Sequence, residues 1–456
     1  MRTRVFQICR LFQIAVLSLL AGLTSGSELV IPDGWETTTP RDEIKPIFQW
    51  IPSHAGGSTT ERFTIKADHR SGLSGAWVTT KPVKGGDWYR FRVNRRTTGM
   101  TLARRSAIAR VIWLNKESKA VLRPDPTFTS YRPGERPRAE PEFPSQSGDS
   151  NQWTTLSGLY HAPADAVTAR IELHFRWGEP NSSVHWSKPI LEKSKPAAKR
   201  IARLAAIHYQ PREGTTASDK REQFASLINQ AAQQQADLVV LPETLTYYSS
   251  GKSFSDVAEA IPGPSSNYFG KLAKQHDLYI VAGLVERDQH LLYNVAVLMG
   301  PDGNLVGKYR KTTLPRGEIE AGLTPGDEYP VFETRFGKVG MMICYDGFFP
   351  EVARELSNRG AEVIAWPVWG CNPLLASARA CENHIYLISS TYTESKRNWI
   401  RTAIYGHDGT PLAAADEFGT VVLTEVDLNR PTYWHSLGDF QSQIQPHRPR
   451  LNDPRP

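Results

Sequence analysis

The sequence predicts two domains of different fold class, an all-β sandwich followed by an α/β domain with a mixed sheet. The chain has 456 residues, more than one ordinary domain contains. Short strand-like runs separated by Gly, Pro, Asn and Asp fill residues 28–195, whereas strand and helix patterns alternate over residues 200–432. A lysine-rich stretch at 192–199 is the expected linker, and residues 433–456 are the expected C-terminal tail.

The first domain carries alternating or apolar runs of strand length. They lie at residues 63–67, 75–79, 88–93, 108–114 and 169–177. Regular short strands with turn signals between them favour a β-sandwich. Residues 82–91 resemble the turn and strand of jelly-roll, carbohydrate-binding-like modules, so a glycan is one candidate ligand, although aromatic side chains in sandwiches usually belong to the core. Residues 123–150, rich in Pro, Arg, Ser and Glu, predict a long exposed loop.

The second domain alternates strands with amphipathic helices. Strands are expected at residues 201–208, 237–241, 278–286, 293–299, 305–310, 337–344, 361–367, 386–391 and 421–426. Helices are expected at residues 220–235, 267–276, 351–359 and 375–384. The Asp302-Gly303 pair between two of these strands predicts a hairpin turn.

The N-terminus has the pattern of a secretory signal peptide. Arg2, Arg4 and Arg10 form a positive region, residues 11–23 are a short apolar run, and residues 24–27 are small. We expect a signal peptide over residues 1–26 and therefore an exported protein, periplasmic, cell-surface or secreted. An uncleaved anchor is the alternative, but the apolar run is short for a membrane span.

Charge and cysteine content exclude several classes of function. The net charge is +7 with a pI near 9.1, but the basic residues are scattered and no nucleic-acid motif accompanies them. Of the four cysteines, Cys9 lies in the expected signal, and the remaining three form no disulfide framework. Cys371 and Cys381 are expected to be buried small residues, although a pairing between them stays open. No Cys/His cluster has metal spacing, and we expect neither a metal nor an organic cofactor.

The most informative stretch is the run at 339–351, which contains Cys344. An apolar strand ends at this cysteine, Asp346 and Gly347 supply a turn, and a helical segment follows. A thiol at such an elbow stands at the end of the sheet, where backbone N–H groups and a helix N-terminus favour a thiolate or an oxyanion. A buried structural thiol is the alternative interpretation.

Two earlier segments favour catalysis. The apolar run at 236–241 ends in Pro242 and Glu243, which places a carboxylate at the carboxyl edge of the sheet, where ligands of α/β proteins bind. The segment at 307–315 follows a hairpin and carries Lys311. An acid, a cation and a thiol therefore occur in chain order, each near the end of a predicted strand.

These three motifs resemble those of the carbon–nitrogen hydrolase (nitrilase) superfamily. The motifs are LVVLPET with Glu243, GKYRKTTLP with Lys311 and GMMICYDGFFPE with Cys344, and the resemblance covers residues 200–432. It implies an αββα sandwich that often dimerises. It also implies hydrolysis of a non-peptide C–N bond through a cysteine thioester. The sequence Cys344-Tyr345-Asp346 is more similar to the amidase and carbamoylase branches than to nitrile-hydrolysing members, which typically show Cys-Trp-Glu.

The resemblance assigns roles to individual residues. Cys344 is the expected nucleophile, Glu243 the acid/base and Lys311 the oxyanion stabiliser. Family members often carry a second glutamate; Glu318 is preferred here, with Glu320 as the alternative. For substrate binding we expect the backbone N–H of Tyr345 to be a second oxyanion donor. Trp366 and Trp369 are expected to line the acyl pocket, or else to be a packed aromatic pair.

Two rival functions stay open. In an acyltransferase of the same superfamily, an amine would replace water in the second step, but the branch known for this carries membrane spans, and no later segment here has about 18 consecutive apolar residues. A non-catalytic glycan-binding protein with a decayed hydrolase domain is the second rival. The intact acid, lysine and cysteine favour a small-molecule amide substrate instead.

Overall fold

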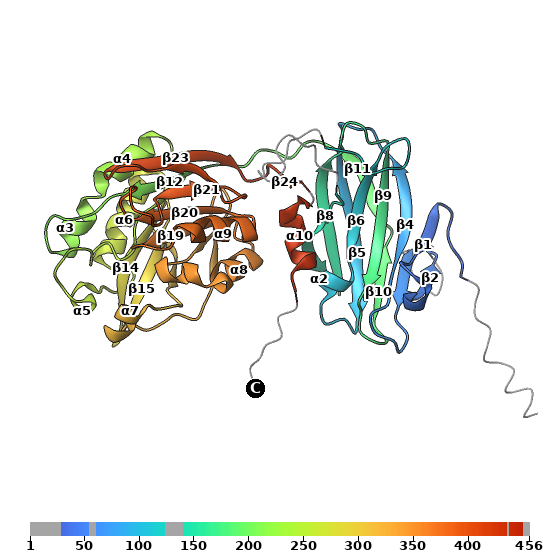
Figure 1. Cartoon of the computed structure of the whole chain (residues 1–456), viewed down its shortest axis with the longest axis horizontal. Coiled ribbons are helices and arrows are strands. Elements are labelled where there is room, and N and C mark those ends of the chain that lie inside the picture. Colours follow the sequence, from blue (N-terminus) through green and yellow to red (C-terminus); the bar gives the residue numbers. More distant parts are fainter. Residues whose placement is uncertain (1–28, 54–60, 124–139, 151, 436, 450–456) are drawn as a thin grey trace, which may run out of the picture.

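The computed structural model describes residues 29–53, 61–123, 140–150, 152–435 and 437–449. Within these ranges the chain forms a β-sandwich and an α/β sandwich joined by an extended segment (Figure 1). The expected signal peptide lies outside the described residues. No helix within them is long and apolar enough to cross a membrane.

The first part of the chain consists of two antiparallel sheets. The first sheet has the order β1-β4-β9-β6, with β1 (Trp35–Thr38), β4 (Ser74–Pro82), β9 (Thr168–Arg176) and β6 (Ala109–Leu114). The second has the order β2-β3-β10-β5-β8-β7, with β11 paired to β5. Its strands are β2 (Ile47–Ile51), β3 (Arg62–Lys66), β10 (Ser183–Ser187), β5 (Trp88–Thr98), β8 (Trp153–His161), β7 (Ser145–Ser150) and β11 (Ile190–Ser194).

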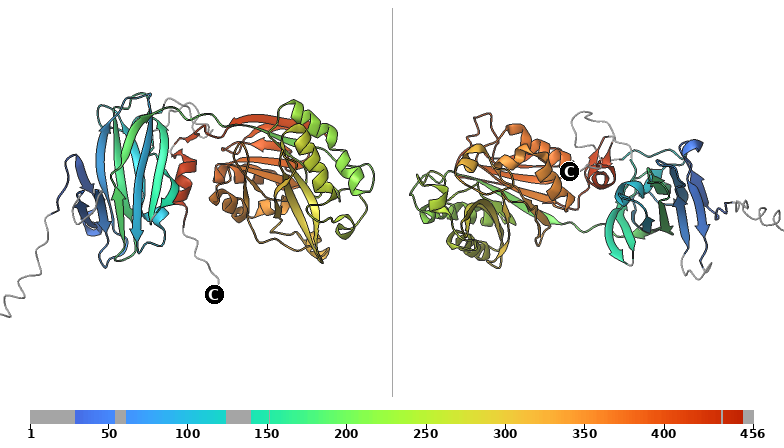
Figure 2. Two further views of the ribbon diagram at one scale, coloured as in Figure 1. Left: turned by 180° about the vertical axis from the view of Figure 1, so that it is seen from behind. Right: turned by 90° about the horizontal axis from the view of Figure 1, so that it is seen from below.

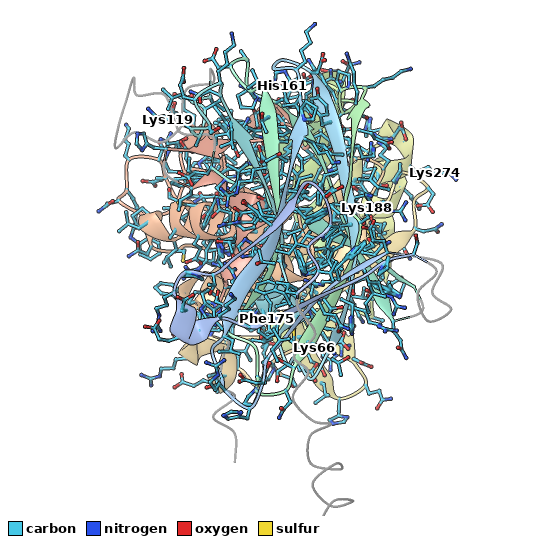
Figure 3. All side chains as sticks on the ribbon, turned by 90° about the vertical axis from the view of Figure 1, so that its right-hand side faces the viewer. Lys66, Lys119, His161, Phe175, Lys188 and Lys274 are labelled. Atoms are coloured by element: carbon cyan, nitrogen blue, oxygen red, sulfur yellow. The ribbon has the colours of Figure 1, made fainter. Side chains whose placement is uncertain are left out.

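Alternation along the strands places apolar side chains between these sheets. In β5, Tyr89, Phe91 and Val93 point into the core while their neighbours point outward. Figure 3 looks onto this part of the molecule, with His161 and buried Phe175 toward opposite ends of the sandwich. Trp77 and Trp113 are fully buried, so these aromatic side chains build the core and are not available to stack on a sugar.

Two sequence-based predictions for this region are wrong. The segment at 123–150 is not an exposed loop throughout, because β7 occupies its end and Glu142 is buried in a salt bridge with Arg123. The expected linker at 192–199 begins inside β11, which pairs with β5 as far as Ser194. The sequence did not predict either feature because both segments are polar. A buried ion pair uses charged residues, and an edge strand can carry polar side chains.

The second part of the chain has two six-stranded mixed sheets stacked face to face. One has the order β16-β15-β14-β13-β12-β23, with β16 (Leu305–Arg310), β15 (Leu291–Met299), β14 (Tyr279–Asp288), β13 (Leu238–Val240), β12 (Ile201–His208) and β23 (Thr420–Asp427). The other has the order β17-β18-β19-β20-β21-β22, with β17 (Val331–Glu333), β18 (Lys338–Met341), β19 (Val363–Val368), β20 (Tyr386–Thr391), β21 (Ala403–Tyr405) and β22 (Pro411–Ala414). The predicted strands agree with the observed ones to within a few residues, whereas β17 has no predicted counterpart.

Helices cover the outer faces of both sheets. The outer helices are α3 (Ala217–Glu222), α4 (Ala225–Gln233) and α6 (Pro264–His276) on the first sheet, and α8 (Pro350–Asn358) and α9 (Pro373–Asn383) on the second (Figure 1). Along β12, Leu204 and Ala206 face the second sheet, whereas Ala205 and Ile207 face the helices. The αββα sandwich is therefore confirmed, although the single helix expected at 220–235 is two helices.

The last described segment, residues 433–435 and 437–449, returns to the β-sandwich. It contains β24 (Tyr433–Trp434), β25 (Gly438–Asp439) and α10 (Phe440–His447), and α10 lies beside the short helix α2 (Ala103–Ser106) (Figures 1 and 2). Arg104 of α2 donates hydrogen bonds to the backbone oxygens of Gln445 (2.6 Å) and Arg448 (3.2 Å). Residues 433–435 and 437–449 of the expected C-terminal tail are thus a packed part of the structure.

Candidate active site

Glu243 lies in the turn that follows β13. Its segment runs so close to β14 that a Cβ at Gly283 would lie 2.5 Å from the Cα of Glu243, which only glycine avoids. The carboxylate is 2% exposed. Its Oε2 accepts a hydrogen bond from the backbone N–H of Trp369 (2.8 Å), and the backbone oxygen of Glu243 accepts one from the Tyr392 hydroxyl (2.7 Å).

Lys311 follows β16 and lies between two carboxylates. Its Nζ donates to Oε1 of Glu243 (2.9 Å) and to Oε1 of Glu318 (2.6 Å), and the residue is 1% exposed. Glu318 comes from the first turn of α7 (Arg316–Glu320). The side-chain amide of Asn294 on β15 donates to the same two oxygens at 2.7 and 3.0 Å. Lysine and both carboxylates are therefore held in one buried network.

The structure separates the two candidates for the second acid. Glu318 is buried in the network with Lys311, whereas the Glu320 side chain is 60% exposed and pairs with Arg316 at the surface. Position in the helix explains the difference, because residues two apart in a helix face different directions. Glu318 is the acid that the fold brings into the site.

Cys344 is the first residue of the short 3₁₀ helix η3 (Cys344–Phe348) after β18. Its φ of 38° lies in the left-handed region, which is strained for a residue with a side chain and typical of functional turns. The thiol lies 3.5 Å from the backbone oxygen of Gly370. Cys371 and Cys381 are free cysteines as well, so the two are not joined in a disulfide.

Asp346 connects the cysteine turn to the lysine loop. Its Oδ2 accepts from the backbone N–H of Ile343 (2.8 Å) and the Tyr309 hydroxyl (2.7 Å), and its Oδ1 accepts from the backbone N–H of Thr313 (3.0 Å). The hydroxyls of Thr312 and Thr313 add further hydrogen bonds to Oδ1. Asp346 is fully buried, so these bonds are made without competing water. The nucleophile turn and the segment after β16 are thereby fixed to each other.

The charges of the site shift several pKa values. Burial raises the pKa of the Cys344 thiol well above its usual range, and the charge of Glu243 adds to this rise while Lys311 opposes it. Burial also raises the pKa of Glu318 to about 7, with Lys311 opposing the rise and Glu243 adding to it. For Lys311, burial disfavours the ammonium, but the charges of Glu243, Cys344 and Glu318 outweigh it and raise its pKa. The resting site therefore holds a neutral thiol and a charged lysine.

The aromatic residues near the site do not match the prediction uniformly. Trp366 is fully buried in β19, and its ring packs where a Cβ of Gly347 would be, so Trp366 supports the nucleophile turn and does not line an open pocket. Trp369 is 40% exposed. Its ring lies 5.1 Å from that of Tyr248 and 5.4 Å from that of Tyr392. These aromatic rings form a wall beside the backbone that binds Glu243.

Tyr345 is half-buried directly after the nucleophile, with its ring 5.3 Å from Phe348 and 5.4 Å from Phe349. Its backbone N–H is therefore the first one beyond Cys344 in the turn.

Sequence reasoning missed Asn294, although a lone asparagine within an otherwise apolar strand was a usable signal, because a buried amide needs partners. Among the residues that the structure describes, no group of three or more His, Cys, Asp or Glu side chains could hold a metal ion.

Comparison with known proteins identifies the family. The profile of the carbon–nitrogen hydrolases matches residues 203–435, about half of the chain. The chain belongs to this family, and it is a hydrolase of C–N bonds with an active-site cysteine.

Two relatives agree with this assignment. The omega-amidase NIT2 of Xenopus tropicalis is 32% identical over 259 residues, which cover 52% of this chain and 91% of the relative. A nitrilase of Pyrococcus abyssi is 41% identical over 182 residues, covering 38% and 68% of the two chains. Among solved structures, a carbon–nitrogen hydrolase from Helicobacter pylori matches with a TM-score of 0.46 and 25% identity over 51% of this chain and 91% of that one.

Proposed function

We propose that this protein hydrolyses the amide bond of a small molecule through a thioester on Cys344, with Glu243 as acid and base and Lys311 as the oxyanion stabiliser. The observation that carries the proposal is the placement of Lys311 Nζ between the carboxylates of Glu243 and Glu318, at 2.9 and 2.6 Å, in the same buried site as the thiol. A cation fixed in a buried site acts on developing negative charge far more strongly than it would in water.

In the first half-reaction the thiol adds to the amide carbonyl. The raised pKa of Cys344 means that the proton must leave during the attack, and Glu243 is the base that receives it. The carbonyl oxygen becomes an oxyanion, stabilised by the Lys311 ammonium and the backbone N–H of Tyr345. The C–N bond then breaks, Glu243 returns its proton to the leaving nitrogen, and an acyl thioester remains.

In the second half-reaction water replaces the amine. Glu243 takes one proton from the water while the water oxygen adds to the thioester carbonyl. Lys311 and the backbone N–H of Tyr345 stabilise the oxyanion again. The C–S bond breaks, the carboxylic acid leaves, and the proton returns to the sulfur. Glu318 holds Lys311, and because burial raises the pKa of Glu318 to about 7 this carboxyl group is only partly ionised near neutral pH. It therefore weakens the lysine as an oxyanion donor less than a fully ionised carboxylate would.

An amide is favoured over a nitrile by the residues after the nucleophile. This chain has Tyr345 and Asp346 there, and relatives that match over most of their length are named omega-amidases. Trp369 and Tyr248 would contact the acyl part of the substrate from the aromatic wall. A panel of amides with different acyl groups would identify the preferred acyl group.

Ammonia release from a panel of small amides tests the proposal. We expect Lys311→Met to lower kcat by about 10²–10³, the usual cost of one oxyanion donor. Cys344→Ala and Glu243→Gln should remove turnover, and mass spectrometry of wild type with substrate should show the acyl adduct on Cys344. Near wild-type turnover by Lys311→Met would remove this lysine from the mechanism. An amide product formed when an amine is added would assign the second half-reaction to acyl transfer.

Localisation and partners complete the proposal. A mature chain that lacks the first 26 residues, seen by intact mass in the exported fraction, would support the signal peptide. Dimerisation through the hydrolase domain and glycan binding by the sandwich stay predictions. Light scattering tests the first, and a glycan array with the full chain tests the second.

A further inference from the structure

A cavity lies in the β-sandwich, at the place where helix α10 covers it. Its volume is about 510 Å³, within the range of small-molecule sites. Residues of β5, β7, β8, α2 and α10 line it. Figure 1 shows α10 beside β8 and α2, on the side of the sandwich that faces the hydrolase domain. Three arginines, Arg95, Arg104 and Arg448, line this cavity, and among the described residues its lining contains no aspartate or glutamate.

Arg95 occupies a position where the strand pattern requires an apolar residue. It continues the inward-facing series of Tyr89, Phe91 and Val93 along β5, and it is 5% exposed. A buried guanidinium is costly unless its charge and its five N–H groups are satisfied. Burial lowers the pKa of Arg95 to about 10, which leaves it charged at neutral pH.

The partners of Arg95 leave part of the guanidinium unused. Its Nη1 donates to the backbone oxygens of Ala103 (3.1 Å) and Ala107, which fixes α2. Its Nη2 has a long contact of 3.4 Å to Oε1 of Gln146, and its Nε has no hydrogen-bond partner among the described residues. Asp149 acts on Arg95 only through its charge; the Asp149 carboxylate itself is exposed and bonded to Gln146. Part of the guanidinium of Arg95, a residue that lines the cavity, therefore has no hydrogen-bond partner among the described residues.

The other two arginines add positive charge from different segments. Arg104 donates to backbone oxygens at the end of α10, and Arg448 follows that helix with a buried Nη1 that has no partner in the described part of the chain. Burial lowers the pKa of Arg104, and the charges of Arg448 and Arg105 add to this fall. Burial also lowers the pKa of Arg448, while the charge of Glu355 opposes the fall. Three cations around one cavity, with no carboxylate in the part of its lining that the structure describes, match a bound anion.

We propose that this cavity binds a polar small molecule through an oxyanion group, a carboxylate, phosphate or sulfate, held by Arg95 and Arg448. The planar guanidinium fork fits such groups with paired hydrogen bonds. Gln146 and Ser442 in the lining can bind hydroxyl groups on the rest of the ligand. The site is separate from the amide-hydrolysing site and does not depend on the proposed catalytic mechanism.

Calorimetry of the wild-type full chain tests this inference. The probes are glucuronate, glucose 6-phosphate and inorganic sulfate, with neutral glucose as the uncharged comparison, all at one chloride concentration. We expect saturable binding of at least one anionic probe and none of glucose. The comparison of glucuronate with glucose 6-phosphate decides whether a carboxylate or a phosphate is the preferred group.

Variants connect binding to the cavity. Arg95→Met should raise the Kd of the bound anion at least about tenfold, as expected for the loss of hydrogen bonds to a charged group. If Arg95→Met does not fold, Arg448→Gln replaces it as the test variant, because Arg448 is less buried; this substitution should also weaken binding of the anion. Arg90→Gln is the matched control, because Arg90 lies on the outer face of the same strand, away from this cavity, and should change affinity less than twofold. Absence of binding by every anion at roughly 10 mM, or equal weakening by Arg90→Gln, would overturn the inference.

Discussion

Replacing Asp346 with asparagine would test how the nucleophile turn is joined to the lysine loop. Asparagine keeps the size of the side chain but replaces one acceptor oxygen with an NH₂ group. The backbone N–H of Ile343 points at Oδ2 (2.8 Å) and that of Thr313 points at Oδ1 (3.0 Å). Whichever way the amide turns, one buried backbone N–H faces another donor.

The magnitude follows from these contacts. A buried donor left without its partner costs about 1–3 kcal/mol, and the remaining hydrogen bonds lose the charge of the carboxylate, so we expect Asp346→Asn to lower the free energy of unfolding by about 2–4 kcal/mol. Domains have about 5–15 kcal/mol in total, so the variant should still fold at low temperature. Because the cysteine turn and the lysine loop would shift against each other, kcat/KM should also fall by about 10²-fold.

Urea unfolding at fixed pH and amide turnover of the same preparations provide the measurement. Asp302→Asn is the control, since Asp302 accepts a backbone hydrogen bond (3.0 Å) in an exposed hairpin turn. It should change stability by less than about 1 kcal/mol and leave turnover unchanged. A loss for Asp346→Asn as small as that of the control would refute the role assigned to Asp346. So would a full loss of stability that left kcat/KM of the folded fraction intact.

Three further outcomes follow from the structure. Gly283→Ala places a Cβ 2.5 Å from the Cα of Glu243, so it should cost about 1–3 kcal/mol and reduce turnover, whereas Gly148→Ala, with open space around it, should do neither. Burial raises the pKa of Glu318 from 4.5 to about 7, so the folded state binds this proton more tightly than the unfolded state does. Stability should therefore fall by up to about 3 kcal/mol as pH rises between these values, and a Glu318→Gln variant whose unfolding curves keep that pH slope would contradict this. Iodoacetamide alkylates Cys344 as the thiolate, and burial raises the pKa of this thiol above its usual value of 9.0, so the alkylation rate should still increase above pH 9.0. Mass spectrometry, with Cys344→Ala as the control, measures this rate. A rate that reaches a plateau near neutral pH would indicate a thiolate already present in the resting enzyme.

Sequence patterns located the strands of the hydrolase domain well because these strands are apolar and end at turn residues. The run at 201–208 matches β12 and the run at 386–391 matches β20 without a shift. The motif residues Glu243 and Lys311 were predicted as separate strand-end groups, and the fold places them in one network. The β-sandwich was harder, because several of its strands are polar or short, as the burial pattern of β11 shows.

What the sequence could not provide is direction in space. Trp366 and Trp369 are three residues apart at the end of one strand, yet one is fully buried beneath the nucleophile turn and the other is 40% exposed at the aromatic wall. Glu318 and Glu320 differ in the same way. Asn294 and Asp346 make hydrogen bonds to residues that are far away in the sequence. Asn294 is 51 residues from its partner Glu243, and Asp346 is 37 residues from its partner Tyr309. No local sequence pattern encodes such contacts.

The placement of Lys311 has a consequence for the proposed reaction. In the resting site its ammonium is shared with Glu243 through a hydrogen bond of 2.9 Å, so the positive charge is already partly neutralised. When Glu243 accepts the thiol proton, that carboxylate loses its charge at the same time as the substrate oxygen gains one. The attraction of Lys311 then passes from the glutamate to the oxyanion without movement of the lysine, which Glu318 and the backbone around it hold in place. Stabilisation of this kind acts on the transition state and not on the bound amide, which is the condition for it to raise kcat.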